Sequence, residues 1–350
     1  YFPFYREKES TKSMEMKMDE KLSVIELLKR AAKLLFGNIN LAFFLFLCSL
    51  PLFCFLIFFE LSLQTTVSLA YRFLSQELNF GDYFALQDQK ELSENDMIPW
   101  LIQISMLYFF PYSLLDLLTT TMTVAASSIV YTSEEEPLRL FYLVQRSIKI
   151  CQTRVGGCLI TSIYVIFWST SVFFGFFSDS TNYLFIASLA RKHESFRSQA
   201  AVLFHAVVVL IHGTVFIVLT AKFSKWSAGW NMGLVVSVLE EDEDGQGIYG
   251  SDALSLSAWY GRGHEKRDLW MMLMFLLFAL AMRIPCLYCK CSENLSRNGV
   301  LYTGLYVGLI CVGNVVKWVV CVVCYHDYRT RVLKKKGDVE LGSKAKSIAT

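Results

Sequence analysis

Ionisable side chains inside long apolar stretches are the first residues of this sequence that could do chemistry. Asp116 and Lys317 each lie within such a stretch. If those stretches enter the membrane from the same side at Ile98 and Val300, the two side chains lie at nearly the same depth. This placement predicts an ion pair, which would offset part of the cost of burying each charge. The alternative is that Lys317 extends to the headgroups while Asp116 faces water.

Two histidines form a second candidate site. His205 and His212 are seven residues apart and therefore lie on one face of a helix. Imidazoles in such an arrangement could form a path for protons or a metal ion, and the alternative is that each simply hydrogen-bonds to a neighbouring helix.

Two groups of the ten cysteines stand out. Cys286, Cys289 and Cys291 follow an apolar stretch closely, which indicates a disulfide or a group of free thiols; a zinc site would need a fourth ligand, and we predict no metal. Cys321 and Cys324 precede a basic tail, as acylated cysteines do.

Enzymatic motifs are absent from the sequence. There is no phosphate-binding glycine loop, no HExxH and no nucleophile elbow, so we expect neither an enzyme nor a cofactor. The net charge of +2 gives no basis for nucleic-acid binding.

The elements that position these residues are apolar helices. Apolar residues make up 54% of the chain and its mean hydropathy is positive, which favours the bilayer as solvent. The predicted fold is an all-α polytopic helical bundle with about six transmembrane helices and amphipathic interfacial helices. The expected spans are residues 41–59, part of 98–131, 155–177, 200–219, 269–289 and 300–324, with Arg283 and Pro285 near the end of the fifth.

Lysine and arginine separate strongly between the two sides of this bundle. One side carries 24 and the other 8, which places both termini in the cytosol. The predicted organisation is a cytosolic segment over residues 1–40, a membrane domain over 41–324 and a basic cytosolic tail over 325–350.

Three cytosolic segments have further character. Residues 21–36 and 140–154 are basic and amphipathic, which suits helices at anionic headgroups. The connection over residues 221–268 holds an acidic run, Glu240 to Asp244, which we expect to be a solvated loop, and then Ser251 to Tyr260, which could form a short helix. Gly304 and Gly308 form a GxxxG pattern for helix packing within the chain or between chains.

The sequence resembles a plant family of uncharacterised multi-pass membrane proteins, distantly similar to the membrane domain found beside bacterial glycerophosphodiester phosphodiesterases. The resemblance rests on WNMGLVVSVLE at 230–240, on TTTMTVAASSIVYT at 119–132, and on Gly250, Ala253, Leu254, Ser257 and the pair Gly261-Arg262. The extra acids from Glu241 to Asp244 depart from the family pattern. The resemblance implies a six-span helical fold and no activity.

These observations predict a non-enzymatic scaffold of the endomembrane or plasma membrane that associates with anionic lipid headgroups on the cytosolic side, with membrane-protein partners or with itself. A transporter of a small solute or an ion is the alternative. Transport would require the polar groups inside the membrane, whereas a scaffold would depend on the basic flanks.

Overall fold

The computed structural model describes residues 23–77, 94–133, 139–192, 199–242, 245–288 and 297–348. Over these residues the chain forms helices joined by short connections, and the β structure is limited to one isolated bridge between Glu241 and Gly247, so the all-α prediction is confirmed. The helices are α2 (Val24–Gly37), α3 (Ile39–Glu77), α4 (Glu94–Leu107), a π turn η1 (Tyr108–Tyr112), α5 (Ser113–Thr132), α6 (Leu140–Lys192), α7 (Gln199–Leu239), α8 (Gly250–Tyr260), α9 (Glu265–Tyr288) and α10 (Arg297–Ile348).

Five of the described helical stretches are long and apolar enough to cross a membrane. They are Ile39–Leu63, Leu101–Thr132, Leu140–Ala187, Leu203–Leu239 and Leu301–Val332. Many of their large side chains are exposed, which suits lipid contact better than water contact. The chain is therefore a multi-pass membrane protein by the length and composition of its helices.

The expected span at residues 269–289 is not one of these five. It falls on α9, whose first turn carries Glu265, Lys266, Arg267 and Asp268 and whose apolar stretch then reaches Arg283. The side chains of α9 are described only as far as Arg283. Within this part, any segment long enough to cross a membrane includes several of these charges, whereas the other five helices have long segments with few charges. The sixth span stays a prediction.

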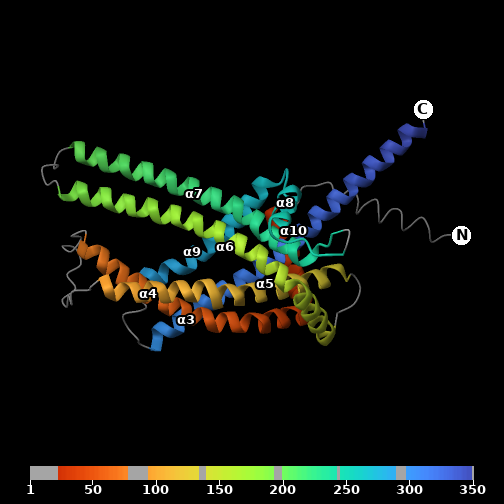
Figure 1. Ribbon diagram of the computed structural model, residues 1–350, viewed down its shortest axis with the longest axis horizontal. Coiled ribbons are helices and arrows are strands. Elements are labelled where there is room, and N and C mark those ends of the chain that lie inside the picture. Colours follow the sequence, from red (N-terminus) through yellow and green to blue (C-terminus); the bar gives the residue numbers. More distant parts are fainter. Residues whose placement is uncertain are drawn as a thin grey trace.

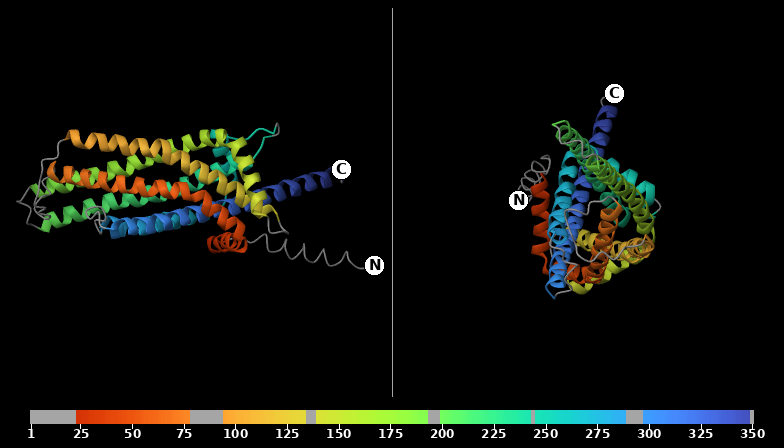
Figure 2. Two further views of the ribbon diagram at one scale, coloured as in Figure 1. Left: turned by 90° about the horizontal axis from the view of Figure 1, so that it is seen from below. Right: turned by 90° about the vertical axis from the view of Figure 1, so that its left-hand side faces the viewer.

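The helices converge at one end of the molecule, here called the α8 end. Figure 1 shows α6 and α7 as a long hairpin whose closed end points away from α8, while α3, α5, α9 and α10 lie beside one another. In both views of Figure 2, α2 runs across the long axis of the bundle at the α8 end, unlike the long helices. Helix α7 contacts α6, α8, α9 and α10, and α8 also contacts α6 and α10.

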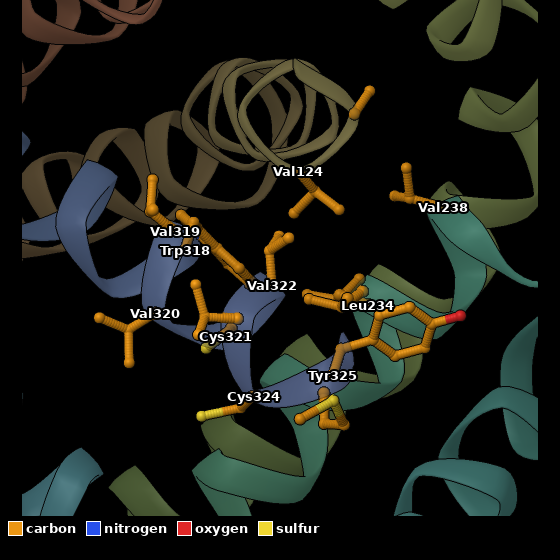
Figure 3. Close-up of a cluster of buried hydrophobic side chains, with 14 of the residues drawn as sticks. Val124, Leu234, Val238, Trp318, Val319, Val320, Cys321, Val322, Cys324 and Tyr325 are labelled. Atoms are coloured by element: carbon orange, nitrogen blue, oxygen red, sulfur yellow. The ribbon is translucent and has the colours of Figure 1, made fainter. Parts of the chain in front are cut away.

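Part of α10 forms the centre of the core. Its residues from Trp318 to Tyr325 are almost completely buried on every side. Figure 3 shows this segment packed among Val124 of α5 and Leu234 and Val238 of α7. Because this segment is buried on every side, the other helices surround it and α10 lies at the centre of the bundle.

The GxxxG pattern of α10 lies at a helix contact within the chain. A Cβ atom added at Gly308 would lie 3.6 Å from the ring of Phe53 on α3, an ordinary packing distance, whereas one at Gly304 would meet nothing within 4 Å. Of the alternatives for this motif, the structure shows close packing within the chain at Gly308.

The second span is interrupted by a wider turn. Pro111 has no N–H group for the helical hydrogen-bond ladder, and the chain forms the π turn η1 at this point before α5 begins. The hydroxyl of Ser113 donates to the carbonyl oxygens of Phe109, at 2.5 Å, and Phe110, at 3.2 Å. The apolar stretch is thus continuous from Leu101 to Thr132 despite the proline.

Glycine allows the segment before α8 to pack against α6. Gly157 of α6 lies directly beneath the ring of Tyr249, and Gly250 has a φ of 63° that favours glycine. The backbone N–H of Gly250 donates to the hydroxyl oxygen of Thr161 at 2.8 Å, and that hydroxyl also lies 2.8 Å from the hydroxyl of Ser237 on α7. These contacts fix the entry to α8.

We predict that Gly157→Ala destabilises the protein by about 1–3 kcal/mol, because the added methyl group must displace the Tyr249 ring. The matched control is Gly156→Ala, where the methyl group meets nothing within 4 Å and alanine improves helix propensity by about 1 kcal/mol. Unfolding in detergent micelles measures both changes. Equal stability of the two variants would contradict this packing.

Candidate functional site

A buried carboxylate stands at the centre of the α8 end. Glu240 is the first residue after α7 and is 9% exposed. Its Oε1 accepts a hydrogen bond from the Tyr260 hydroxyl at 2.9 Å and another from the Tyr325 hydroxyl at 2.6 Å. The Nε of Arg329 lies 3.5 Å from the same oxygen. We call these four residues the Glu240 cluster; they join the end of α7 to α8 and α10.

The prediction of a solvated acidic loop is wrong for Glu240. The apolar run before it packs α7 into the core up to its last turn, so the carboxylate emerges among the helices and not in solvent. Its neighbour Glu241 is exposed and pairs with the Arg154 guanidinium of α6. The prediction of a short helix from Ser251 to Tyr260 is confirmed by α8, which positions the Tyr260 hydroxyl.

The Tyr260 hydroxyl stays protonated over the whole physiological pH range and donates a hydrogen bond to this carboxylate. Burial, together with the hydrogen bond to Glu240, raises the pKa of its phenol to about 12. The hydroxyl therefore acts as a fixed donor. The arrangement holds a charge in place by neutral donors and one partly exposed guanidinium.

A second polar group, the Asp268 cluster, lies where α9 begins. Asp268 accepts a hydrogen bond from the Tyr328 hydroxyl at 2.5 Å, and burial raises the pKa of its carboxyl group. Arg267 places an Nη1 atom 3.4 Å from Asp327 and its guanidinium carbon 4.9 Å from the centre of the Tyr328 ring. Arg331 lies 3.2 Å from Asp327. These contacts attach the start of α9 to α10.

A cleft of about 510 Å³ opens beside the Asp268 cluster. It lies mainly between α7, α8 and the first turn of α9, and most of its lining is apolar. Three indole rings contribute to it, those of Trp168, Trp226 and Trp230. Its polar groups include Asp268 and the ion pair between Lys225 and Glu265. We call it the tryptophan cleft.

The structure places Asp116 and Lys317 on the neighbouring helices α5 and α10, and their charges are close enough to interact. The nearest polar contact of Asp116 is nevertheless Asn314, whose Nδ2 donates to Oδ1 at 3.3 Å. The ammonium of Lys317 lies 4.4 Å from the Trp318 ring centre. Among the described ion pairs none joins Asp116 directly to Lys317, so this ion pair stays a prediction.

The two histidines differ in their surroundings. His212 is half-buried, and its Nδ1 lies 2.7 Å from an Asp179 oxygen on α6. His205 is exposed and lies about two turns further from the α8 end. The structure thus gives His212 an acidic partner that the sequence pattern did not indicate. Among the described residues, no ion pair joins an acidic side chain to His205.

The cysteine predictions have different outcomes. Cys289 and Cys291 lie outside the described residues, as does the side chain of Cys286, so that cluster stays a prediction. Cys321 and Cys324 are buried as free thiols, and the Cys324 sulfur lies 3.8 Å from that of Met271. Neither thiol has room for an acyl chain in this packing. Acylation would require α10 to leave the core.

Arg283 of α9 has a partner that the sequence did not indicate. The Nη2 atom of Arg283 on α9 lies 2.5 Å from Oε2 of Glu60 on α3, and the Glu60 side chain is buried. Such a pair offsets the cost of placing either charge between apolar helices. It also fixes α9 against α3 far from α8.

The predicted basic tail begins inside the bundle. Helix α10 runs without a break through residue 325 to Ile348. Arg329 and Arg331 contact the acids Glu240 and Asp327, so these two cations already have partners within the protein.

Comparison of the chain with protein-family models, with curated proteins and with solved structures finds no match. Within the described residues no group of histidine, cysteine, aspartate and glutamate side chains could hold a metal ion. The candidate site is therefore defined by its geometry: the Glu240 cluster, the Asp268 cluster and the tryptophan cleft beside them.

We predict that Tyr325→Phe lowers the free energy of unfolding by about 1.5–3 kcal/mol, because it removes a buried hydrogen bond to a charged acceptor. Tyr142→Phe is the matched control, since that hydroxyl accepts an exposed bond from Arg146 and its loss should cost less than about 0.5 kcal/mol. Denaturant titration in mixed micelles compares the two. If both variants lose the same stability, Glu240 does not have the role described.

Proposed function

We propose that the protein is a non-enzymatic multi-pass membrane protein whose α8 end associates with anionic lipid headgroups. The observation that carries this proposal is α2, which crosses the end of the bundle instead of running along it (Figure 2). A helix in that position can lie in the plane of the headgroups.

The two faces of α2 have opposite character. Leu27 and Ala31 are completely buried against the core. Lys29 and Lys33 are exposed, as is Arg30, one turn from the Glu26 carboxylate with which it pairs. The Ser23 hydroxyl caps the first turn by accepting from the Glu26 N–H at 3.3 Å. The cations are thus held on the outside by a helix that is anchored on the inside.

Large apolar side chains lie beside these cations. Phe36 is 85% exposed and Ile39 is 80% exposed, at the junction of α2 and α3. Exposed aromatic and aliphatic groups next to exposed lysines are the combination that an interfacial helix uses, with the apolar groups in the acyl boundary and the cations at phosphates.

The start of α6 repeats this arrangement. Leu143 and Ser147 are buried, while Phe141 is 79% exposed and Arg146 and Lys149 are exposed. Both amphipathic segments belong to the side that carries most of the lysine and arginine, which supports a cytosolic α8 end with both termini on that side.

The proposal has further parts. Helix α9 is the sixth span, and the protein lies in the endomembrane or plasma membrane. The chain is similar to the plant family, and it associates with membrane proteins or with a second copy of itself.

We predict that Lys29→Gln with Lys33→Gln weakens the preference for phosphatidylserine over phosphatidylcholine by up to about 2 kcal/mol, at about 1 kcal/mol per lysine. The charge-keeping control is Lys29→Arg with Lys33→Arg. Spin-labelled lipids in reconstituted membranes at low salt measure the preference. A wild-type protein with no preference, or a neutralised variant that keeps it, would exclude this function.

Ion transport is a second candidate, supported by polar contacts inside the apolar helices. These are the bond between Asp116 and Asn314 and the pair between His212 and Asp179. A half-buried imidazole next to a carboxylate can exchange a proton, so the ion that this geometry favours is H⁺.

For proton transport we predict that His212→Gln reduces flux at least tenfold and that His205→Gln does not, since of the two histidines His212 alone has an acidic partner among the described residues. Proteoliposomes with an internal pH dye and an imposed potential measure the flux. Wild-type flux equal to that of empty liposomes would exclude proton transport and leave the lipid-associating function standing.

A further inference from the structure

The tryptophan cleft lies where two apolar stretches end. On α7, Lys222 and Lys225 follow a stretch without charges, and on α9 the charged first turn precedes another. Charged residues in these places mark the level at which helices leave the hydrocarbon for the headgroups. The cleft, which contains Lys225 and Glu265, is therefore at the depth of lipid headgroups.

The charges in the cleft match a zwitterion. Lys225 Nζ lies 2.5 Å from Glu265 Oε2, and the two side chains are 50% and 60% exposed. A pair so exposed is weak and can open at little cost. Lys225 is then free to bind a phosphate and Glu265 to face a cation. Asp268 adds a second carboxylate to the lining, which makes the cleft more favourable to a cationic group than to an anion alone.

The aromatic lining points to the kind of cation. The ring centres of Trp226 and Trp230 are 6.4 Å apart and their planes are inclined by 37°. Trp168 and Tyr328 also line the cleft. Several aromatic faces around one space bind quaternary ammonium groups through cation–π attraction, and a quaternary ammonium group needs no hydrogen-bond acceptor.

The backbone leaves room for such a group. A Cβ atom added at Gly229, which lines the cleft, would meet nothing within 4 Å. The Gly229 carbonyl accepts from the Ser257 hydroxyl at 3.0 Å, which holds α8 against α7 at this point. The volume of about 510 Å³ is within the usual range of small-molecule sites, about 300–1,000 Å³.

We propose that the tryptophan cleft binds the phosphocholine headgroup of a membrane phospholipid. Lys225 binds the phosphate, the trimethylammonium group lies against the indole rings of Trp226 and Trp230, and Glu265 faces its positive charge. The acyl chains leave the cleft toward the bilayer. This site is separate from the lysines of α2, which attract anionic lipid without regard to headgroup shape.

The test uses the full chain in maltoside micelles and native mass spectrometry of bound lipid. The probes are diheptanoylphosphatidylcholine, diheptanoylphosphatidylglycerol and soluble glycerophosphocholine. We expect the phosphatidylcholine to bind at least tenfold more tightly than either of the others. Trp226→Ala should weaken phosphatidylcholine binding about tenfold, because it removes one of the two rings against which the trimethylammonium group lies. The ring is 47% exposed, so its removal should leave the fold intact.

Filling the cleft provides the matched comparison. Gly229→Leu should abolish phosphatidylcholine binding, whereas Gly213→Leu, another α7 glycine with nothing within 4 Å, should preserve it. Equal binding of the two lipids, or unchanged binding in both Gly229→Leu and Trp226→Ala, would overturn the proposal. Equal binding of glycerophosphocholine would overturn a lipid as the occupant. None of these variants alters α2, so each result is independent of the anionic-lipid experiment.

Discussion

The α8 end depends on the need to stabilise one buried carboxylate. Glu240 directly follows α7, whose last turns are enclosed in the core, and only 9% of the residue is exposed. An unpaired charge there would cost several kcal/mol, and the donors that prevent this come from α8 and α10. Satisfying this carboxylate therefore requires α8 to fold back and α10 to pass through the centre of the bundle.

The features with functional character gather around this constraint. The Asp268 cluster attaches α9 to the same turn of α10, the tryptophan cleft opens beside it, and α2 packs on α10 through Leu27 and Ala31. The far part of the α6–α7 hairpin, by contrast, exposes Leu210, Ile217 and other large apolar side chains. The molecule thus separates a hairpin with an exposed apolar surface from a polar, packed end.

Much of the fold follows from the sequence, because span length and the position of charges are local properties. They predict the apolar helices, α2 and α8. The partners of buried polar groups are not local: depth counting suggested Lys317 for Asp116, whereas the nearest polar contact is Asn314, one turn away on the same helix. The acidic run after Leu239 likewise looked solvated because nothing local indicates that Tyr260 and Tyr325 converge on Glu240. Residues 119–132 and 230–240 are largely those that the core buries.

The uninterrupted course of α10 has a mechanical consequence. From Tyr328, which is buried, the helix continues to Ile348 and leaves the bundle, as Figure 1 shows. Twenty residues of helix at about 1.5 Å each make a lever arm of about 30 Å. A force applied at its tip is transmitted as torque to the segment that carries Tyr325 and Tyr328, and through their hydroxyl groups to Glu240 at the end of α7 and to Asp268 of α9.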